Sequence, residues 1–187
     1  MRFKHFFLEA LAVDAVNTEV GKTETTVIMG RFQPPTAAHI QIIKDAYKKY
    51  KLPVAVFIVK SKTEKSPFEV SLIEKILEAA LKGIKYDIYV IDNGFIGEFI
   101  DILRNNGKEP KYLMAGSDRI KSYNGQIKRY KEKLNLSLEV KEISRSDEDI
   151  SASKVRQALQ DDDVETFEKM TDRSTHNFYK QLQKALK

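Results

Sequence analysis

Apolar residues occur along the chain in short runs that alternate with longer segments of helical periodicity. Short runs rich in β-branched and aromatic residues are typical of buried strands, and longer amphipathic segments are typical of helices. We expect strands at Thr25–Met29, Val54–Val59, Ile88–Ile91, Tyr112–Ala115 and Leu138–Glu142, separated by helices at Ala37–Tyr50, Val70–Leu81, Ile96–Asn105 and Ser122–Leu134. Strands that alternate with helices form parallel sheets. The pattern therefore predicts an α/β fold: a Rossmann-like, parallel five-stranded sheet with helices on both faces.

Both ends of the chain carry helical patterns alone. Apolar residues within Met1–Val16 fit an amphipathic helix, and Glu9 and Asp14 interrupt this segment in a way that argues against a secretion signal. After the last strand, helices are expected at Ser153–Gln160, Val164–Met170 and His176–Leu186. These patterns divide the chain into residues 1–24, an N-terminal helical extension and linker; residues 25–160, the α/β domain; and residues 161–187, C-terminal helices packed on that domain.

The composition limits the classes of protein to which the chain can belong. Its 187 residues and 42% hydrophobic content suit one compact domain. Because it has no cysteine, disulfides are excluded, and we expect a reducing compartment such as the cytoplasm. No apolar run approaches the roughly 20 residues that span a bilayer, so no membrane partner is expected. The net charge of +5 indicates affinity for anionic ligands, and we expect no nucleic-acid partner.

The stretch Gly30–His39 is the main candidate for chemistry. It lies between an expected strand and an expected helix, and this order leaves free backbone N–H groups and the positive end of a helix dipole at one place. Two prolines end the strand, Thr36 is a good N-cap, and His39 falls in the first helical turn. The stretch thus predicts an anion site, although taken alone His39 also fits a helix-capping or buried histidine.

Two motifs in this sequence resemble those of the nucleotidylyltransferase superfamily, especially its nicotinamide mononucleotide adenylyltransferase branch. Gly30-Arg31-Phe32-Gln33-Pro34 with Thr36-Ala37-Ala38-His39 resembles the G-R-F-x-P and H/T-x-G-H signature, and Ile150–Arg156 resembles the motif I-S-x-S/T-x-x-R. Gly116-Ser117-Asp118 is similar to a G-x-D loop found in some members. The resemblance covers about residues 25 to 160 in outline, and the two motifs occur in the order that the family has.

The resemblance implies transfer of a nucleoside monophosphate, most simply AMP from ATP, to a small phosphorylated acceptor such as nicotinamide mononucleotide. It implies Mg²⁺ as cofactor, bound mainly through substrate phosphates and not by a metal site of the protein. The run Asp161–Asp163 is accordingly interpreted as a solvated turn in which Asp163 caps the next helix. By the same resemblance the catalytic residues are His39, Thr36 and Arg156. The residues that bind the nucleotide or phosphate are Gly30, Arg31, Phe32, Gln33, Ser151, Ser153, Gly116 and Asp118. A lysine of the loop after the expected strand Val54–Val59, which is Lys60, Lys62 or Lys65, joins them.

Several alternatives stay open. Ala38 stands where the family has glycine, and Lys75 follows Glu74 where the branch tends to have arginine, so a weak or inactive structural protein is the second hypothesis. Two further alternatives are a cytidylyltransferase and a fragment of a class I aminoacyl-tRNA synthetase. The opening segment Phe3–Ala10 resembles nicotinamide mononucleotide adenylyltransferase-like and cytidylyltransferase-like proteins of tailed bacteriophages. That similarity implies action in an infected bacterium or in the virion, with a phage-head partner for the first helix, and a homo-oligomer is also compatible with the sequence.

Overall fold

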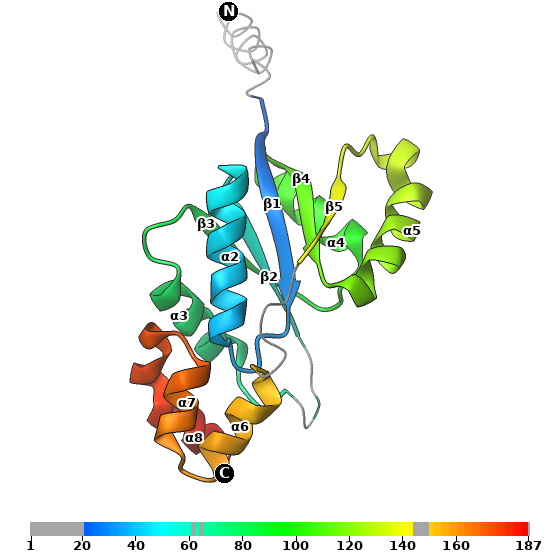
Figure 1. Ribbon diagram of the computed structural model, residues 1–187. Coiled ribbons are helices and arrows are strands. Elements are labelled where there is room, and N and C mark those ends of the chain that lie inside the picture. The colour runs from blue at the N-terminus through cyan, green and yellow to red at the C-terminus, as the bar shows by residue number, and fades with distance from the viewer. Residues whose placement is uncertain (1–20, 61–62, 64–65, 144–149, 187) are drawn as a thin grey trace, which may run out of the picture.

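The computed structural model describes residues 21–60, 63, 66–143 and 150–186, and its centre is one parallel sheet (Figure 1). Five strands pair in the order β3-β2-β1-β4-β5, and every pairing is parallel. This confirms the expected Rossmann-like α/β fold. The strands are β1 (Thr23–Gly30), β2 (Val54–Val59), β3 (Tyr86–Ile91), β4 (Lys108–Ala115) and β5 (Glu139–Glu142).

Helices cover both faces of the sheet. One face carries α2 (Ala37–Tyr50), α3 (Val70–Ala80) and the C-terminal elements α6 (Ala152–Gln160), α7 (Val164–Met170), η1 (Arg173–Phe178) and α8 (Tyr179–Ala185). The other face carries α4 (Ile96–Asn105) and α5 (Ser117–Leu134). The bounds of α2, α4 and α7 are those expected from the sequence.

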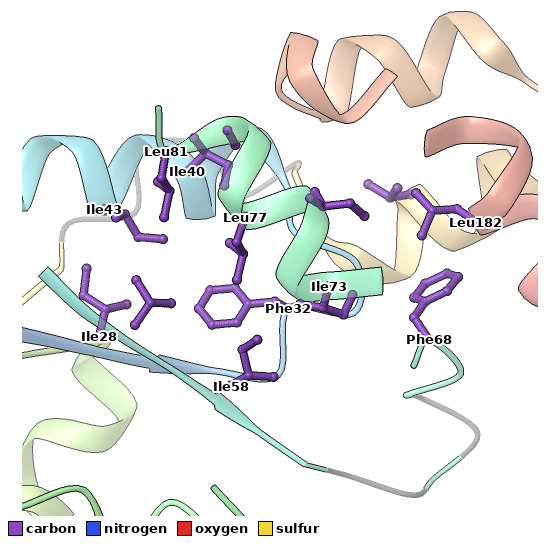
Figure 2. Packing of buried hydrophobic residues seen from close by; sticks show 14 of the residues in the cluster. Ile28, Phe32, Ile40, Ile43, Ile58, Phe68, Ile73, Leu77, Leu81 and Leu182 are labelled. Carbon is purple, nitrogen blue, oxygen red and sulfur yellow. The ribbon is translucent and has the colours of Figure 1, made fainter. Parts of the chain in front are cut away.

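Neighbouring residues of the central strands face opposite layers, as the twofold period of a strand requires. In β1, Val27 joins the cluster under α4 and α5, whereas Ile28 joins the cluster under α2 and α3. Figure 2 shows this second cluster, in which Phe32 lies with Ile58 and Leu77. Because both faces of the sheet are buried, β2 is apolar throughout and the second halves of β1 and β4 are apolar, and these are the segments that could be recognised in the sequence.

The strand order reverses at β1. The chain moves from β1 to β2 and β3 on one side and then to β4 and β5 on the other. In such sheets ligands bind beyond the carboxyl ends of the strands at the point of reversal. The loops that follow β1 and β4 lie at that point, and they hold Gly30–Thr36 and Gly116.

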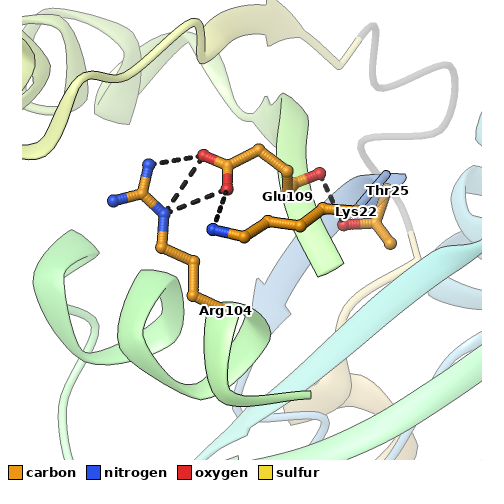
Figure 3. A network of polar contacts seen from close by, with 4 residues as sticks. All are labelled: Lys22, Thr25, Arg104 and Glu109. Atoms are coloured by element: carbon orange, nitrogen blue, oxygen red, sulfur yellow. Dashed lines mark hydrogen bonds and ion pairs between the residues drawn. The ribbon is translucent and has the colours of Figure 1, made fainter. Parts of the chain in front are cut away.

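A polar network lies near the opposite, amino-terminal edge of the sheet (Figure 3). The Glu109 carboxylate of β4 accepts hydrogen bonds from Arg104 of α4 and pairs with Lys22 at 3.6 Å, and the Glu109 carbonyl accepts from Thr25 of β1 at 3.4 Å. The hydrogen bond with Glu109 raises the pKa of Arg104, against the effect of partial burial. The network therefore joins α4, β1 and β4 away from the candidate site.

Several boundaries differ from expectation by one or two residues, and three elements begin at least three residues earlier than expected. Helix α5 begins at Ser117 and not at Ser122, because the expected Gly-Ser-Asp loop is already its first turn. Strand β4 begins at Lys108 and not at Tyr112. Pro110 lies in this earlier part, where β4 pairs only with β1 because β5 joins from Tyr112 onward. Proline is tolerated there because it lies at an edge of the sheet. The last expected helix begins earlier, as the 3₁₀ element Arg173–Phe178, before α8.

Two expectations lie outside the described residues: the helix at Met1–Val16, and phosphate contacts from Lys62 or Lys65. Within the part of the chain that the structure describes, no helix is long and apolar enough to cross a lipid bilayer.

Candidate active site

The loop after β1 turns sharply inward at Phe32. This residue has a φ of +50°, an unusual left-handed conformation for a bulky side chain, and only 3% of it is exposed. Its ring folds back over Gly30: a Cβ on Gly30 would lie 3.0 Å from the ring. Glycine is thus required for close approach, and Arg31 between them stays exposed.

The Gln33 side chain holds a second loop in place. Its amide nitrogen donates to the Phe68 carbonyl at 3.0 Å, and its amide oxygen accepts from the Phe68 N–H at 2.9 Å. Gln33 and Phe68 are both buried. The Gln33 amide is therefore engaged within the protein, and it positions the segment Ser66–Phe68 beside the loop. Sequence reasoning had assigned Gln33 to nucleotide binding and had no signal for this contact, because 35 residues separate the two partners.

Thr36 and His39 cap the start of α2 for each other. The His39 N–H donates to Thr36 Oγ1 at 3.3 Å, and the Thr36 N–H donates to His39 Nδ1 at 3.1 Å, with Thr36 Oγ1 also 2.9 Å from Nδ1. Because Nδ1 accepts a backbone N–H, the network assigns the proton of the neutral ring to Nε2. The Phe32 ring packs edge-on against His39 at 5.3 Å and fixes the imidazole from a second side. Nε2–H is thereby a positioned donor at a helix N-terminus.

Arg156 brings a second helix start to this loop. From the first turns of α6, one of its guanidinium nitrogens donates to the Gln33 carbonyl at 2.6 Å and another donates to Ser153 Oγ at 3.1 Å. Ser151 is the N-cap of α6 and accepts from the Lys154 N–H at 3.2 Å, as its position in the sequence predicts. The two motifs, 123 residues apart at the Arg156–Gln33 contact, therefore meet in space.

Two positive charges gather here without a negative one. Burial and then the nearby charge of Arg31 lower the pKa of Arg156. Among the described residues, neither arginine forms an ion pair with a carboxylate, although the chain has 27 acidic residues. Like charges held together cost free energy that a bound anion recovers. Together with the N-termini of α2 and α6, the pair is the candidate site for an anion such as a phosphate chain.

The remaining predicted residues lie at neighbouring strand ends. Gly116 is the N-cap residue of α5, at the carboxyl end of β4, and Asp118 in the first turn pairs with Arg119 at 3.6 Å. Lys60 follows β2 and pairs with Asp92 beyond β3 at 2.9 Å. Within the described ranges, no hydrogen bond or ion pair joins Lys60, Gly116 or Asp118 to Arg156 or the Thr36–His39 pair. They line the same sheet edge without completing the anion site.

The described residues contain no group of three histidine, aspartate or glutamate side chains that could hold a metal ion. The Asp161–Asp163 run is the solvated turn expected from the sequence: all three residues are exposed, and Asp163 caps α7 by accepting from the Thr166 N–H at 3.0 Å. The donor chemistry at the candidate site suits phosphate oxygens and not a metal ion bound directly by the protein.

Comparison with known proteins gives matches in fold and family. A search of curated protein sequences finds no significant match. Among solved structures, the chain is similar to the nicotinic acid mononucleotide adenylyltransferase of Plasmodium falciparum complexed with NaAD, with a TM-score of 0.63 and 14% identity over 87% of this chain and 97% of that one. The same enzyme complexed with APC matches with a TM-score of 0.63, 13% identity and the same coverage. At these identities the likeness shows the fold alone. The sequence model of the cytidylyltransferase-like family matches residues 27–158, and the chain belongs to this family of nucleotidyltransferases.

Proposed function

We propose that the protein transfers AMP from ATP to a small phosphorylated acceptor, such as nicotinamide mononucleotide, and releases pyrophosphate. The observation that carries the proposal is the hydrogen bond of Arg156 to the Gln33 carbonyl, because it joins the two motifs around one anion site. The similarity to a nicotinic acid mononucleotide adenylyltransferase favours ATP and a mononucleotide acceptor.

The reaction needs alignment and charge neutralisation more than acid–base chemistry. A phosphate oxygen of the acceptor attacks the α-phosphorus, the bond from this phosphorus to the oxygen shared with the β-phosphorus breaks, and pyrophosphate leaves. The attacking phosphate is already ionised near neutral pH. The chain's contribution is to hold the triphosphate in line and to stabilise the charge that grows on the leaving group.

His39 and Arg156 supply this stabilisation in different ways. Nε2–H of His39 donates to the phosphate chain, and Thr36 keeps the ring in the required tautomer through Nδ1. The Arg156 guanidinium has donors left after its contacts with Gln33 and Ser153, since arginine has five N–H groups. Those donors, together with the exposed Arg31, neutralise the outer phosphates.

Mg²⁺ fits this arrangement as an ion carried by the substrate. It would be held by phosphate oxygens and water, because the described residues offer cations and hydrogen-bond donors at the site. When bound, it would supply further neutralisation of the triphosphate charge.

The test is release of pyrophosphate from ATP in the presence of Mg²⁺ and nicotinamide mononucleotide. His39→Ala should lower kcat at least about 100-fold, the scale of losing one key transition-state donor. His176→Ala is the matched control, because His176 lies in η1 and contacts Glu168. It should leave kcat within about twofold, because the contacts of His176 with Glu168 and Phe167 do not involve the candidate site.

The substrate panel decides between the remaining alternatives. A higher kcat/KM with CTP than with ATP would assign the protein as a cytidylyltransferase. If none of the four triphosphates reacts with any of a set of acceptor phosphates, the second hypothesis, a structural protein that keeps the fold, would replace the enzymatic one. Ala38, in the first turn of α2, motivates this hypothesis.

A further inference from the structure

Helix α5 carries most of the net charge of the chain. It contains two acidic residues, Asp118 and Glu132, and six basic ones: Arg119, Lys121, Lys128, Arg129, Lys131 and Lys133. The helix therefore has a net charge of +4, out of +5 for the whole chain.

These cations are exposed, and most have no partner within the described residues. All six basic side chains belong to exposed residues, and the one ion pair that involves them there joins Arg119 to Asp118 at 3.6 Å. Elsewhere in the described structure some lysines pair closely with carboxylates, such as Lys108 and Lys111, both at 2.6 Å, and others, such as Lys48 and Lys82, form no ion pair, so α5 is distinguished by the number of its cations. The α5 surface thus attracts external negative charge.

The cations lie on both flanks of the helix. With about 3.6 residues per turn, Lys121, Lys128 and Lys131 fall on one flank, and Arg129 and Lys133 fall on the other. Lys128 and Arg129 are about 100° apart around the helix, so a flat anionic surface cannot face both flanks directly. A groove with phosphates along both walls would meet both.

The apolar face of α5 is already occupied. Ile127 is buried in the cluster with α4, and Tyr123, Tyr130 and Leu134 pack against that cluster. The large apolar residues exposed in the described structure are Phe95 and Val164, and neither belongs to α5. Binding in a lipid interface needs an outward apolar face, and a stable protein interface needs an apolar centre. Neither is offered by the solvent side of this helix.

We propose that α5 binds the phosphate backbone of double-stranded DNA, without reading its sequence. A helix with side chains is about 10–12 Å wide and fits the major groove of about 12 Å. Figure 1 shows α5 at one side of the molecule, away from α6–α8, and the basic residues of the helix are exposed. This inference goes beyond the proposed enzymatic activity, and it revises the expectation that no nucleic acid is bound.

The test is fluorescence anisotropy with the full chain and a labelled duplex of about 20 base pairs, measured between about 50 and 200 mM salt, where phosphate contacts change affinity most clearly. The test variant replaces four α5 cations by glutamine: Lys128→Gln, Arg129→Gln, Lys131→Gln and Lys133→Gln. The control variant removes the same charge from exposed lysines elsewhere: Lys48→Gln, Lys82→Gln, Lys85→Gln and Lys184→Gln.

We expect the α5 variant to lose at least about tenfold in affinity and to have a shallower salt dependence, because fewer counterions are released. The control variant should stay within about threefold of the unchanged protein, since it keeps the local charge of α5. Equal losses in the two variants would overturn the proposal. So would tighter binding to a single strand of the same length, or equal binding to vesicles of anionic phospholipid.

The activity measurements keep this proposal separate from the enzymatic one. His39→Ala should bind the duplex normally, and the α5 variant should release pyrophosphate at the unchanged rate. A protein that binds DNA without turnover would contradict only the enzymatic proposal, and one with turnover but no binding would contradict only this one.

Discussion

Phe32 shows how a single residue organises the candidate site. Its left-handed backbone turns the ring inward, and the ring then packs over Gly30 and beside His39. A non-glycine residue in this conformation is held by its surroundings, here by the core cluster with Ile58 and Leu77. The loop is therefore rigid at the point where Arg31 is presented.

Gly30→Ala should destabilise the protein, because the new methyl group would meet the Phe32 ring at 3.0 Å and the ring is packed in the core. We expect a loss of about 1–3 kcal/mol in the free energy of unfolding, the usual cost of overpacking. The control is Gly125→Ala in α5, where no atom lies within 4 Å of the added Cβ. It should stabilise by about 0.5–1 kcal/mol through helix propensity. Urea denaturation of both variants measures the difference, and equal shifts would contradict the argument.

Sequence reasoning at this scale identified residue types but not their contacts. Thr36 and Asp163 were predicted as N-caps from local pattern alone, and both cap their helices. The inward turn of Phe32 had no local signal. It depends on core residues that come later in the chain, so the sequence around the loop does not contain the cause.

At the scale of elements, the candidate site is formed where three segments contact the loop after β1. Hydrogen bonds connect this loop to three segments: to α2 through Thr36, to the segment before α3 through Gln33, and to α6 through Arg156. Each of these hydrogen bonds has a backbone group as one partner, so three elements hold the loop in the structure without ligand.

Gln33→Ala should be costly, because it leaves the buried N–H and C=O of Phe68 without their partners. Two such groups imply a loss of about 2–4 kcal/mol in the free energy of unfolding. Gln41→Ala, which removes an exposed hydrogen bond to Asp45, should cost less than about 0.5 kcal/mol. Chemical denaturation compares them. A cost below 1 kcal/mol for Gln33→Ala would mean that water satisfies Phe68.

Over the whole molecule, the C-terminal helices complete the core on one face of the sheet. Phe167 of α7 and Tyr179 of α8 pack ring to ring at 5.0 Å, and the Tyr179 hydroxyl donates to Asp162 at 2.8 Å. Burial and then the hydrogen bond to Asp162 raise the pKa of Tyr179 to about 12. The folded state therefore holds this proton more firmly than the unfolded chain, whose tyrosines titrate near pKa 10.

This difference predicts a loss of stability at alkaline pH. The contribution of Tyr179 is fully present below about pH 10 and is lost as the pH rises toward 12. We expect the unfolding free energy of the unchanged protein to fall more steeply over this range than that of Tyr179→Phe, which has no phenol to ionise. Urea denaturation at a series of pH values measures both slopes, and parallel slopes would show that the hydroxyl titrates normally.

The fold could be predicted because its signals are local. Runs of apolar residues marked the five strands, and the bounds of α2 and α4 matched those in the structure. Helix α5 was predicted to start too late, since its first turn, Ser117–Ile120, carries turn-forming residues. The charge on α5 was visible in the sequence, but its exposure, and the small number of ion pairs it forms with other described residues, depend on which elements pack nearby. Such long-range facts, like the Arg156–Gln33 contact, could not be predicted from pattern.

That contact has a consequence for the newly made protein. Translation delivers the loop after β1 early and Arg156 only 123 residues after Gln33. A nascent chain that already holds all five strands still lacks α6, and so it presents His39 without its distant arginine partner. If the proposed function holds, tight binding of nucleotide begins only once α6 has been made, and ligand affinity would distinguish chains that include α6 from chains that stop before it.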